Sequence, residues 1–374
     1  MRTIQRFIDG WFERQRDVQP RQYWARTRDG WNLALYRYQP RRGGHATPVV
    51  LCHGMSSNRW DMDAPGSMSM ARWLRRRGYD VWVIELRGAG RSMRPRWFNG
   101  KCYAWSFEDY VQHDAPAALR VVLRETGAAR VHWVGHSMGG MIAYALLMSP
   151  VHHKIASAVT LGSPTMSQVG HPLLDFGVPY RFLLRYVPGR IALGTVARVA
   201  APAAPLLTRI LRPSVAELGW YPGNADVALL RTLMLIAVDD IPASLLREFA
   251  RWYDTRVMSD RYGMFDFSAH LERITVPVCV IAGSHDGLTP VRDLEEVYRR
   301  IASPEKTFRV VGQAHGCARN YSHADLVLGR HASDDVFPIV LEWLEARRAA
   351  TPRAHRPRRR GRREAEATRH AESR

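Results

Sequence analysis

The sequence predicts an α/β protein in which a mostly parallel sheet is flanked by helices. Three apolar runs, TPVVLCHG, GYDVWVIELRG and ARVHWVGHSMGG, each end at a glycine-containing loop, which is typical of buried strands. Segments with a helical spacing of apolar residues lie between them. This alternation implies parallel strands joined by right-handed crossovers, so functional residues are expected just after the carboxyl ends of the strands.

The later elements follow the same pattern. The helical segment MSMARWLRRRG closes at Gly78, and SFEDYVQHDAPAALRVVLRETG closes at Gly127, both suitable as helix C-caps. IASAVTLGSP predicts a further strand, VPVCVIAG and KTFRVVG predict two late strands, and VRDLEEVYRRIA and DDVFPIVLEWLEARR predict the helices that follow them.

The alternation is interrupted once. Residues 165–270 carry apolar helical segments separated by prolines, with little strand character, and predict a helical cap inserted into the core. The core is therefore expected in two parts, residues 25–164 and 271–346, after an N-terminal helical segment over residues 1–24. Residues 347–374 lack core-forming side chains and predict a disordered, arginine-rich tail.

The formal charge of +19 is unevenly distributed along the chain. Residues 347–374 contain eleven arginines and three glutamates, a net +8, which leaves +11 for the rest. Because the chain has only three lysines, Lys101, Lys154 and Lys306, an overall arginine bias explains the excess more simply than a partner does. The tail is a candidate for weak contact with an anionic membrane, and no specific nucleic-acid binding is expected.

Several classes of protein are not indicated. Apolar runs stay shorter than the roughly 18 residues of a membrane span, and the N-terminus mixes charged and apolar residues, unlike a signal peptide. The four cysteines and the histidines show no metal-ligand spacing, and Cys52 and Cys279 lie in predicted strands. We therefore expect a cytoplasmic protein with no metal and no cofactor.

One motif carries the chemistry. Gly135-His136-Ser137-Met138-Gly139 fits G-x-S-x-G and lies between a predicted strand and a predicted helix, the context of a nucleophile elbow. The elbow strains the serine backbone, and the two glycines let neighbouring backbones approach. The motif predicts the α/β-hydrolase fold, with Ser137 as the nucleophile.

A serine nucleophile needs a base and an acid that orients the base. In this fold the chain order is serine, acid, histidine, and Asp286 follows the late strand VCVIAG as the acid would. The histidine should lie between the last strand and the last helix, where His315, His323 and His331 are candidates. Spacing alone slightly favours His315, which is nearest the end of the strand.

The whole sequence resembles the acid lipase-like branch of the α/β-hydrolases. LCHGMSSNRW, GYDVWVIELRGAGRS, GHSMGGM, AGSHDGLTP and YSHADLVLG occur in the order seen there, over residues 25–165 and 270–346 but not over the cap. The resemblance implies that His323 is the base, because Tyr321 to Asp325 matches an Asn-His-Leu-Asp-like segment, with His315 as the alternative. Related polyhydroxyalkanoate synthases are expected to carry cysteine at the elbow, so the serine here favours hydrolysis.

The oxyanion formed at the attacked carbonyl is expected to bind two backbone N–H groups. In this fold these belong to the residue after the nucleophile, Met138, and to the loop after an early strand, where Met55 follows His53-Gly54. His53 and His136 are interpreted as structural residues that hold these turns.

The predicted function is a serine hydrolase that cleaves carboxylic esters of apolar acyl chains through an acyl-enzyme, with a small-molecule ester or lipid as substrate. An acyltransferase, a thioesterase or a polyester-active enzyme would use the same triad, and the sequence leaves these alternatives open. A non-catalytic scaffold is disfavoured, because it would not need Ser137, Asp286 and His323 together. Asp109 and Asp114 are interpreted as scaffold residues, and the role of Glu85 is left open.

Overall fold

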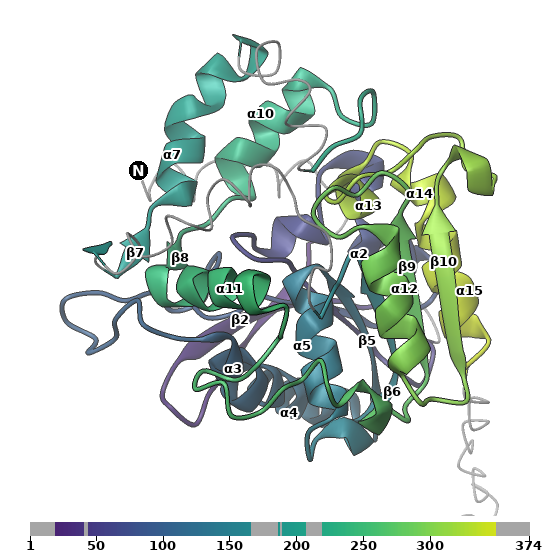
Figure 1. The fold of residues 1–374 in the computed structure, drawn as a ribbon, viewed down its shortest axis with the longest axis horizontal. Coiled ribbons are helices and arrows are strands. Elements are labelled where there is room, and N and C mark those ends of the chain that lie inside the picture. The colour runs from purple at the N-terminus through teal and green to yellow at the C-terminus, as the bar shows by residue number, and fades with distance from the viewer. Residues whose placement is uncertain (1–18, 41–43, 166–185, 188, 207–218, 349–374) are drawn as a thin grey trace, which may run out of the picture.

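One eight-stranded sheet forms the centre of the chain in a computed structural model, which describes residues 19–40, 44–165, 186–187, 189–206 and 219–348. The strand order is β1-β2-β4-β3-β5-β6-β9-β10, and β2 alone runs against its neighbours while the other pairings are parallel. The predicted mostly parallel sheet is thus confirmed (Figure 1). The strands are β1 (Arg21–Arg26), β2 (Asn32–Tyr38), β3 (Val49–Cys52), β4 (Val81–Ile84), β5 (Val131–His136), β6 (Ile155–Leu161), β9 (Val278–Gly283) and β10 (Lys306–Val311).

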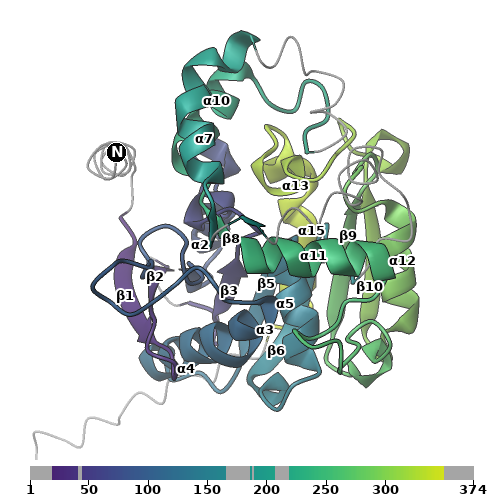
Figure 2. The same cartoon turned by 60° about the vertical axis from the view of Figure 1, so that its left-hand side comes forward.

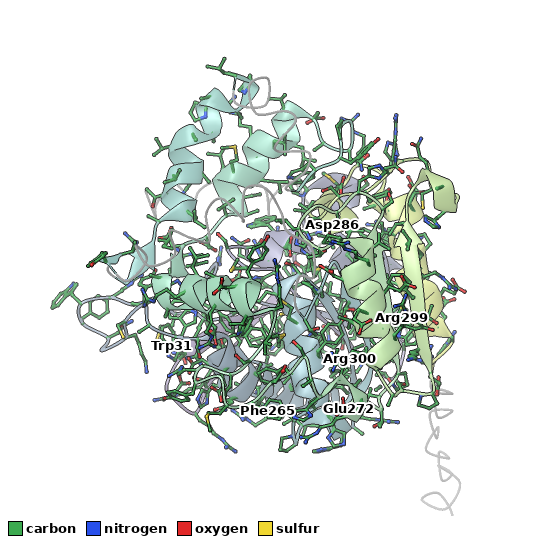
Figure 3. The ribbon with its side chains drawn as sticks, in the orientation of Figure 1. Trp31, Phe265, Glu272, Asp286, Arg299 and Arg300 are labelled. Carbon is green, nitrogen blue, oxygen red and sulfur yellow. The ribbon has the colours of Figure 1, made fainter. Side chains whose placement is uncertain are left out.

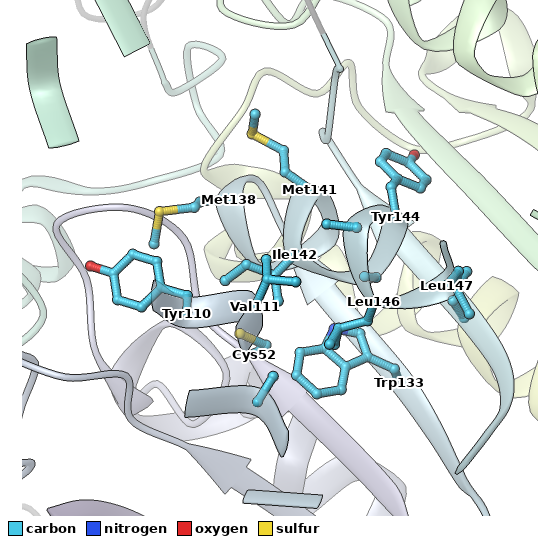
Figure 4. Close-up of a cluster of buried hydrophobic side chains, with 14 of the residues drawn as sticks. Cys52, Tyr110, Val111, Trp133, Met138, Met141, Ile142, Tyr144, Leu146 and Leu147 are labelled. Carbon is cyan, nitrogen blue, oxygen red and sulfur yellow. The ribbon is translucent and has the colours of Figure 1, made fainter. Parts of the chain in front are cut away.

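Helices cover both faces of this sheet. Every residue of β3, β4, β5 and β9 is buried, as expected for parallel strands packed on two sides. One face packs against α4 (Ala115–Thr126), α5 (Met138–Leu147) and α12 (Val291–Arg300), and the other against α2 (Met70–Arg76) and α15 (Phe337–Glu345). Figure 4 shows side chains of α5 with Trp133 and Cys52 from the strands.

The two predicted helix ends carry left-handed glycines. Gly78 has φ +92° directly after the C-cap of α2. Gly127 is the C-cap of α4 with φ +69°, and its N–H donates to the Leu123 carbonyl at 2.9 Å. Between residues 106 and 127 the predicted single helix divides into α3 (Phe107–Asp109), a π-helical turn (Tyr110–Asp114) and α4.

The predicted N-terminal helical segment is wrong for residues 21–24. These residues belong to β1, which pairs along its whole length with β2 and places the Tyr23 ring 4.9 Å from that of Trp82. Pairing with a neighbouring strand outweighs local helix preference here, because sheet formation depends on contacts between separate segments. Residues 1–18 lie outside the described residues.

The region predicted as a cap contains α7 (Leu193–Ala200), α10 (Val227–Ile236) and α11 (Ala243–Thr255). In both views α7 and α10 stand beyond the body of the sheet, and α11 lies across it near α5 (Figures 1 and 2). A two-stranded ladder, β7 (Arg190–Ile191) with β8 (Ile241–Pro242), was not expected from the sequence. The boundaries of the cap, 165–270, stay a prediction.

The carboxyl-terminal end of the described chain packs on the core. Near the carboxyl terminus, the side chain of Arg347 bonds Glu305 at 2.8 Å and stacks on Trp343, so this residue packs on the core rather than in the predicted tail. Residues 349–374 lie outside the described part. Within the described residues, no helix is long and apolar enough to cross a membrane. The remaining short helices are Arg59–Asp61, Gly66–Met68, His152–Lys154, Ala201–Ala203, Leu271–Arg273, Gln313–His315 (η8), α13 (Asp325–Leu328) and α14 (Ala332–Asp335).

Candidate active site

The turn between β5 and α5 holds Ser137 in a strained conformation. Ser137 has φ +50° and ψ −120°, a region that residues with a side chain rarely occupy. Its N–H donates to the Leu161 carbonyl at 2.8 Å, which ties the turn to β6. A Cβ on Gly135 would lie 2.3 Å from the Gly139 carbonyl, so the turn closes only with glycine at that position. The serine hydroxyl thereby projects at the amino end of α5.

The three predicted residues lie in one chain of hydrogen bonds. The Ser137 Oγ is 2.9 Å from Nε2 of His323, and Nδ1 of His323 is 2.8 Å from Oδ2 of Asp286. Asp286 and His323 are buried, whereas Ser137 is partly exposed. Such an arrangement lets the imidazole accept the hydroxyl proton at Nε2 while the carboxylate orients Nδ1–H.

The loop after β9 positions the carboxylate. Asp286 accepts hydrogen bonds from the N–H groups of Leu288 at 2.9 Å and Thr289 at 2.8 Å, and from the Thr289 hydroxyl. Sequence reasoning missed Thr289, although the Asp-x-x-Thr spacing is typical of a turn in which a carboxylate accepts from following residues. Asp286 lies at the end of the sheet nearest to α7 and α10, the helices of the predicted cap (Figure 3).

The alternative histidines lie elsewhere. His315 is exposed on η8, and His331 is the partly exposed N-cap residue of α14. Among the hydrogen bonds of the described residues, neither ring bonds Ser137 or Asp286. His323 therefore is the candidate that the fold brings against the serine.

The two backbone N–H groups predicted to bind the oxyanion belong to segments that adjoin Ser137. Met138 is the first residue of α5, and first-turn N–H groups have no acceptor inside their own helix. Met55 follows Gly54, where a Cβ would lie 3.2 Å from Cβ of Ser137, so this loop passes directly beside Ser137. Within the described residues neither N–H has a protein acceptor. Both remain free to bind a developing oxyanion.

Comparison with known proteins gives the family. The model of the alpha/beta hydrolase fold family matches residues 47–316, most of the chain. The chain belongs to the α/β-hydrolase family.

Relatives and solved structures of this α/β-hydrolase agree with that assignment. Human lipase member K is 34% identical over 133 residues, 33% of each chain, so the match spans a third of that relative. A probable lipase of Schizosaccharomyces pombe is 25% identical over 350 residues, covering 86% of this chain and 76% of that protein. A thermophilic esterase from Thermogutta terrifontis covers 88% of this chain and 100% of its own, with a TM-score of 0.55 and 18% identity, which shows a shared fold.

Two further histidines hold the turns around Ser137. The His53 ring bonds the Gly54 carbonyl at 2.8 Å and accepts from the Leu86 N–H at 3.2 Å. Nδ1 of His136 is 2.9 Å from the Asp61 carboxylate, and Nε2 is 3.2 Å from the His323 carbonyl. Both agree with the structural roles expected from the sequence.

The His136 ring is suited to the protonated state. Burial alone lowers the pKa of this imidazole, but the charge and hydrogen bond of Asp61 outweigh burial and raise it. Asp61 also accepts from the Gly54 N–H at 2.9 Å, so one carboxylate joins the elbow to the loop that carries Met55. Sequence reasoning missed Asp61, because no local spacing marks a contact across 75 residues.

The three acidic residues noted in the sequence bond other segments of the chain rather than Ser137. Asp114 is fully buried and bonds Arg87 at 2.7 Å, and Asp109 bonds Arg261, in keeping with scaffold roles. Glu85 is buried beyond β4, where burial raises the pKa of its carboxyl to about 7. Its carboxylate accepts from backbone N–H groups and from a tyrosine hydroxyl, so it braces the loop after β4.

One group among the described residues has the spacing of metal ligands. Atoms of Asp29, Asp109 and His113 lie within 4.8 Å of one another. However, Arg87 bonds Asp29 at 2.7 Å and Arg261 bonds Asp109. Two guanidinium groups already neutralise these carboxylates, so the chemistry of the cluster favours ion pairs over a cation.

Proposed function

We propose that this chain is a serine hydrolase that cleaves carboxylic esters of apolar acyl chains. The observation that carries the proposal is the continuous hydrogen-bonded path from the Ser137 hydroxyl through His323 to Asp286. A structural serine does not need a buried imidazole and carboxylate aligned behind it. The strained backbone at Ser137 supports the same reading, because strain of this kind gathers at functional sites.

The reaction follows from the positions of the groups. Ser137 Oγ attacks the ester carbonyl while Nε2 of His323 takes its proton, and Asp286 stabilises the imidazolium that forms. The N–H groups of Met55 and Met138 bind the oxyanion. Collapse releases the alcohol, which receives the proton from His323, and leaves an acyl group on Ser137. Water, deprotonated by His323, then hydrolyses that acyl-enzyme and restores the serine.

The substrate class is supported by the surroundings and by the relatives. Met138 directly follows Ser137, and the Met141 N–H donates to the Ser137 carbonyl at 3.1 Å, so two apolar residues occupy the first turn of α5 after the serine. Figure 4 shows their side chains on this helix. Several relatives are lipases by name, among them gastric triacylglycerol lipases of rat and human. An ester with an apolar acyl chain fits both observations.

The test is hydrolysis of p-nitrophenyl esters from acetate to palmitate. We expect turnover by the wild type, with a loss on the order of 10⁶-fold in kcat for Ser137→Ala and about 10⁴-fold for Asp286→Asn. Ser157→Ala is the matched control, because Ser157 is a buried serine in β6 that bonds His132 and Trp343. Equal activity of Ser137→Ala and wild type would refute the proposal.

An acyl group could also pass from Ser137 to an alcohol or thiol. Turnover that needs an added alcohol acceptor and releases no free acid would assign acyl transfer in place of hydrolysis.

Two parts of the proposal concern location. A cytoplasmic location of the protein is supported by the four cysteines, because all of them are free thiols and two are buried. Weak contact of the arginine-rich tail with anionic membranes involves residues outside the described part. It is tested by truncation after Arg348, which keeps the contacts of Arg347 with the core, and by liposome binding at low salt, where unchanged binding would refute it.

A further inference from the structure

The loop that carries Met55 is held from two sides. On the core side, Gly54 donates to Asp61, as described above. On the other side, residues 56–58 bond the segment that follows α10. The Ser56 hydroxyl donates to the Asp239 carbonyl at 2.6 Å, and the Asp239 N–H donates to the Ser56 carbonyl at 2.8 Å. Met55 therefore lies between an anchor in the core and an anchor in the predicted cap.

The backbone of this loop needs such support. Ser56 has φ +57°, one of three positive-φ residues other than glycine among the described residues, together with Ser137 and Arg256. A conformation of this kind persists only where surrounding contacts impose it. The paired hydrogen bonds to Asp239 supply that constraint directly beside Met55.

The Asp239 carboxylate joins three segments. It is buried, with 3% of the residue exposed, and Oδ2 accepts from the Asn58 side chain at 2.9 Å and from the Gly90 N–H at 2.7 Å. Oδ1 accepts from the guanidinium of Arg94 at 2.5 Å. One charge thus fastens the loop after β3 to the loop after β4. A buried carboxylate with three donors is strongly bonded, and its loss removes an acceptor from each of them, although the Asn58 side chain keeps its bond to the Ile236 carbonyl.

We propose that Asp239 is a positioning residue that sets the N–H of Met55 for the oxyanion, and so couples the cap to the chemical step. This inference rests on the proposed function. Because an oxyanion donor acts only when it is aimed at the place where charge develops, a small displacement of this loop lowers transition-state binding more than substrate binding. Asp239 itself touches neither Ser137 nor His323 in the hydrogen-bond network.

The test compares Asp239→Asn with Asp240→Asn. The adjacent Asp240 is also buried, but its carboxylate bonds Arg190 and Gly194, both within the cap region. In Asp239→Asn an amide NH₂ replaces one carboxylate oxygen, so it faces N–H donors of Asn58, Gly90 or Arg94 and cannot accept from them. We expect kcat for a p-nitrophenyl ester to fall about 10- to 10²-fold, less than the 10² to 10³ typical of losing a donor entirely, with KM within about twofold. Asp240→Asn should keep wild-type values.

Two readouts separate positioning from general damage. Phenylboronic acid forms a tetrahedral anionic adduct on a serine hydroxyl, so its inhibition constant should rise by the same factor as kcat/KM falls. The acid limb of the kcat/KM pH profile should be the same in Asp239→Asn and wild type, because Asp239 bonds neither His323 nor Asp286. A shifted acid limb with unchanged boronate inhibition would overturn the inference. Active-site titration with a fluorophosphonate corrects both variants for the folded fraction.

A milder variant covers a failure to fold. Ser56→Ala removes one uncharged hydrogen bond to Asp239, and a loss of about two- to tenfold in kcat with the same boronate pattern is expected. If Asp239→Asn does not fold and Ser56→Ala matches wild type, the inference is wrong. Wild-type turnover with equal Asp239→Asn and Asp240→Asn activities refutes this inference alone. Absence of Ser137-dependent turnover in the wild type refutes the proposed function and this inference together.

Discussion

Replacing Gly139 by alanine tests how closely α5 must approach the sheet. A Cβ at this position would lie 2.3 Å from the Cys52 carbonyl oxygen and 2.9 Å from that of His53, both backbone atoms of β3 and its loop. Ordinary contact needs about 3.4 Å, so roughly 1 Å of separation must open between the start of α5 and the end of β3. Neither neighbour is a flexible side chain that can turn away.

That displacement has two expected costs. Overpacking a core position typically lowers the free energy of unfolding by about 1 to 3 kcal/mol. Ser137 and the N–H of Met138 begin α5, while Met55 follows β3, so the same 1 Å separates the proposed nucleophile from one of the proposed oxyanion donors. A misplacement of this size costs about 10² in rate, and we expect kcat of Gly139→Ala to fall by that factor.

The assay combines p-nitrophenyl ester kinetics with urea unfolding. Gly127→Ala is the matched control, because Gly127 also lies beside a helix end but has open space where a Cβ would project. Its φ of +69° predicts a loss of about 1 kcal/mol in stability with unchanged kcat. Wild-type kcat in folded Gly139→Ala would refute the reasoning, because it would mean that the elbow tolerates the displacement.

Two further predictions concern buried charges. The Glu248 carboxyl accepts from the Phe107 N–H at 2.8 Å, and burial raises its pKa to about 7. The folded state therefore favours the protonated carboxyl. The resulting contribution of Glu248 to stability is present below about pH 4.5 and is lost as the pH rises through 7. Glu248→Gln keeps an acceptor, so its free energy of unfolding should match that of wild type near pH 4.5 and exceed it by about 1 to 3 kcal/mol above pH 7. Urea titrations at several pH values measure this difference, and a difference that does not change with pH would contradict the prediction. Arg87→Met should lower the free energy of unfolding by about 3 to 5 kcal/mol, because it leaves Asp114 buried without its partner. Arg330→Met, which breaks an exposed ion pair, should change it by less than about 1 kcal/mol, and equal effects of the two substitutions would contradict the scaffold role of Asp114.

Much of the fold could be predicted from local sequence. The fully buried strands around β5 appear as unbroken apolar runs, because a strand covered on both faces needs apolar residues at every position. The elbow could also be predicted from local sequence, because the strand, the serine between two glycines and the helix follow one another directly in the chain. Asp286 could be placed because the acid follows a late strand at the same edge of the sheet. The strand β1 could not, because its stability comes from pairing with β2 rather than from its own residues.

The partners that hold the site in place were decided only by the tertiary structure. Spacing left three histidines open and slightly favoured His315, whereas the fold brings His323 to the serine from 186 residues away. Asp61 and Asp239 reach the Met55 loop from a short helix and from the predicted cap, and nothing in their neighbouring sequence marks them. The sequence by itself determined the buried parallel strands and the position of the elbow at Ser137, because these depend on neighbouring residues and on the burial of apolar runs. The tertiary structure decided which buried polar groups face one another, because a carboxylate is stable in the interior only where distant segments supply its donors.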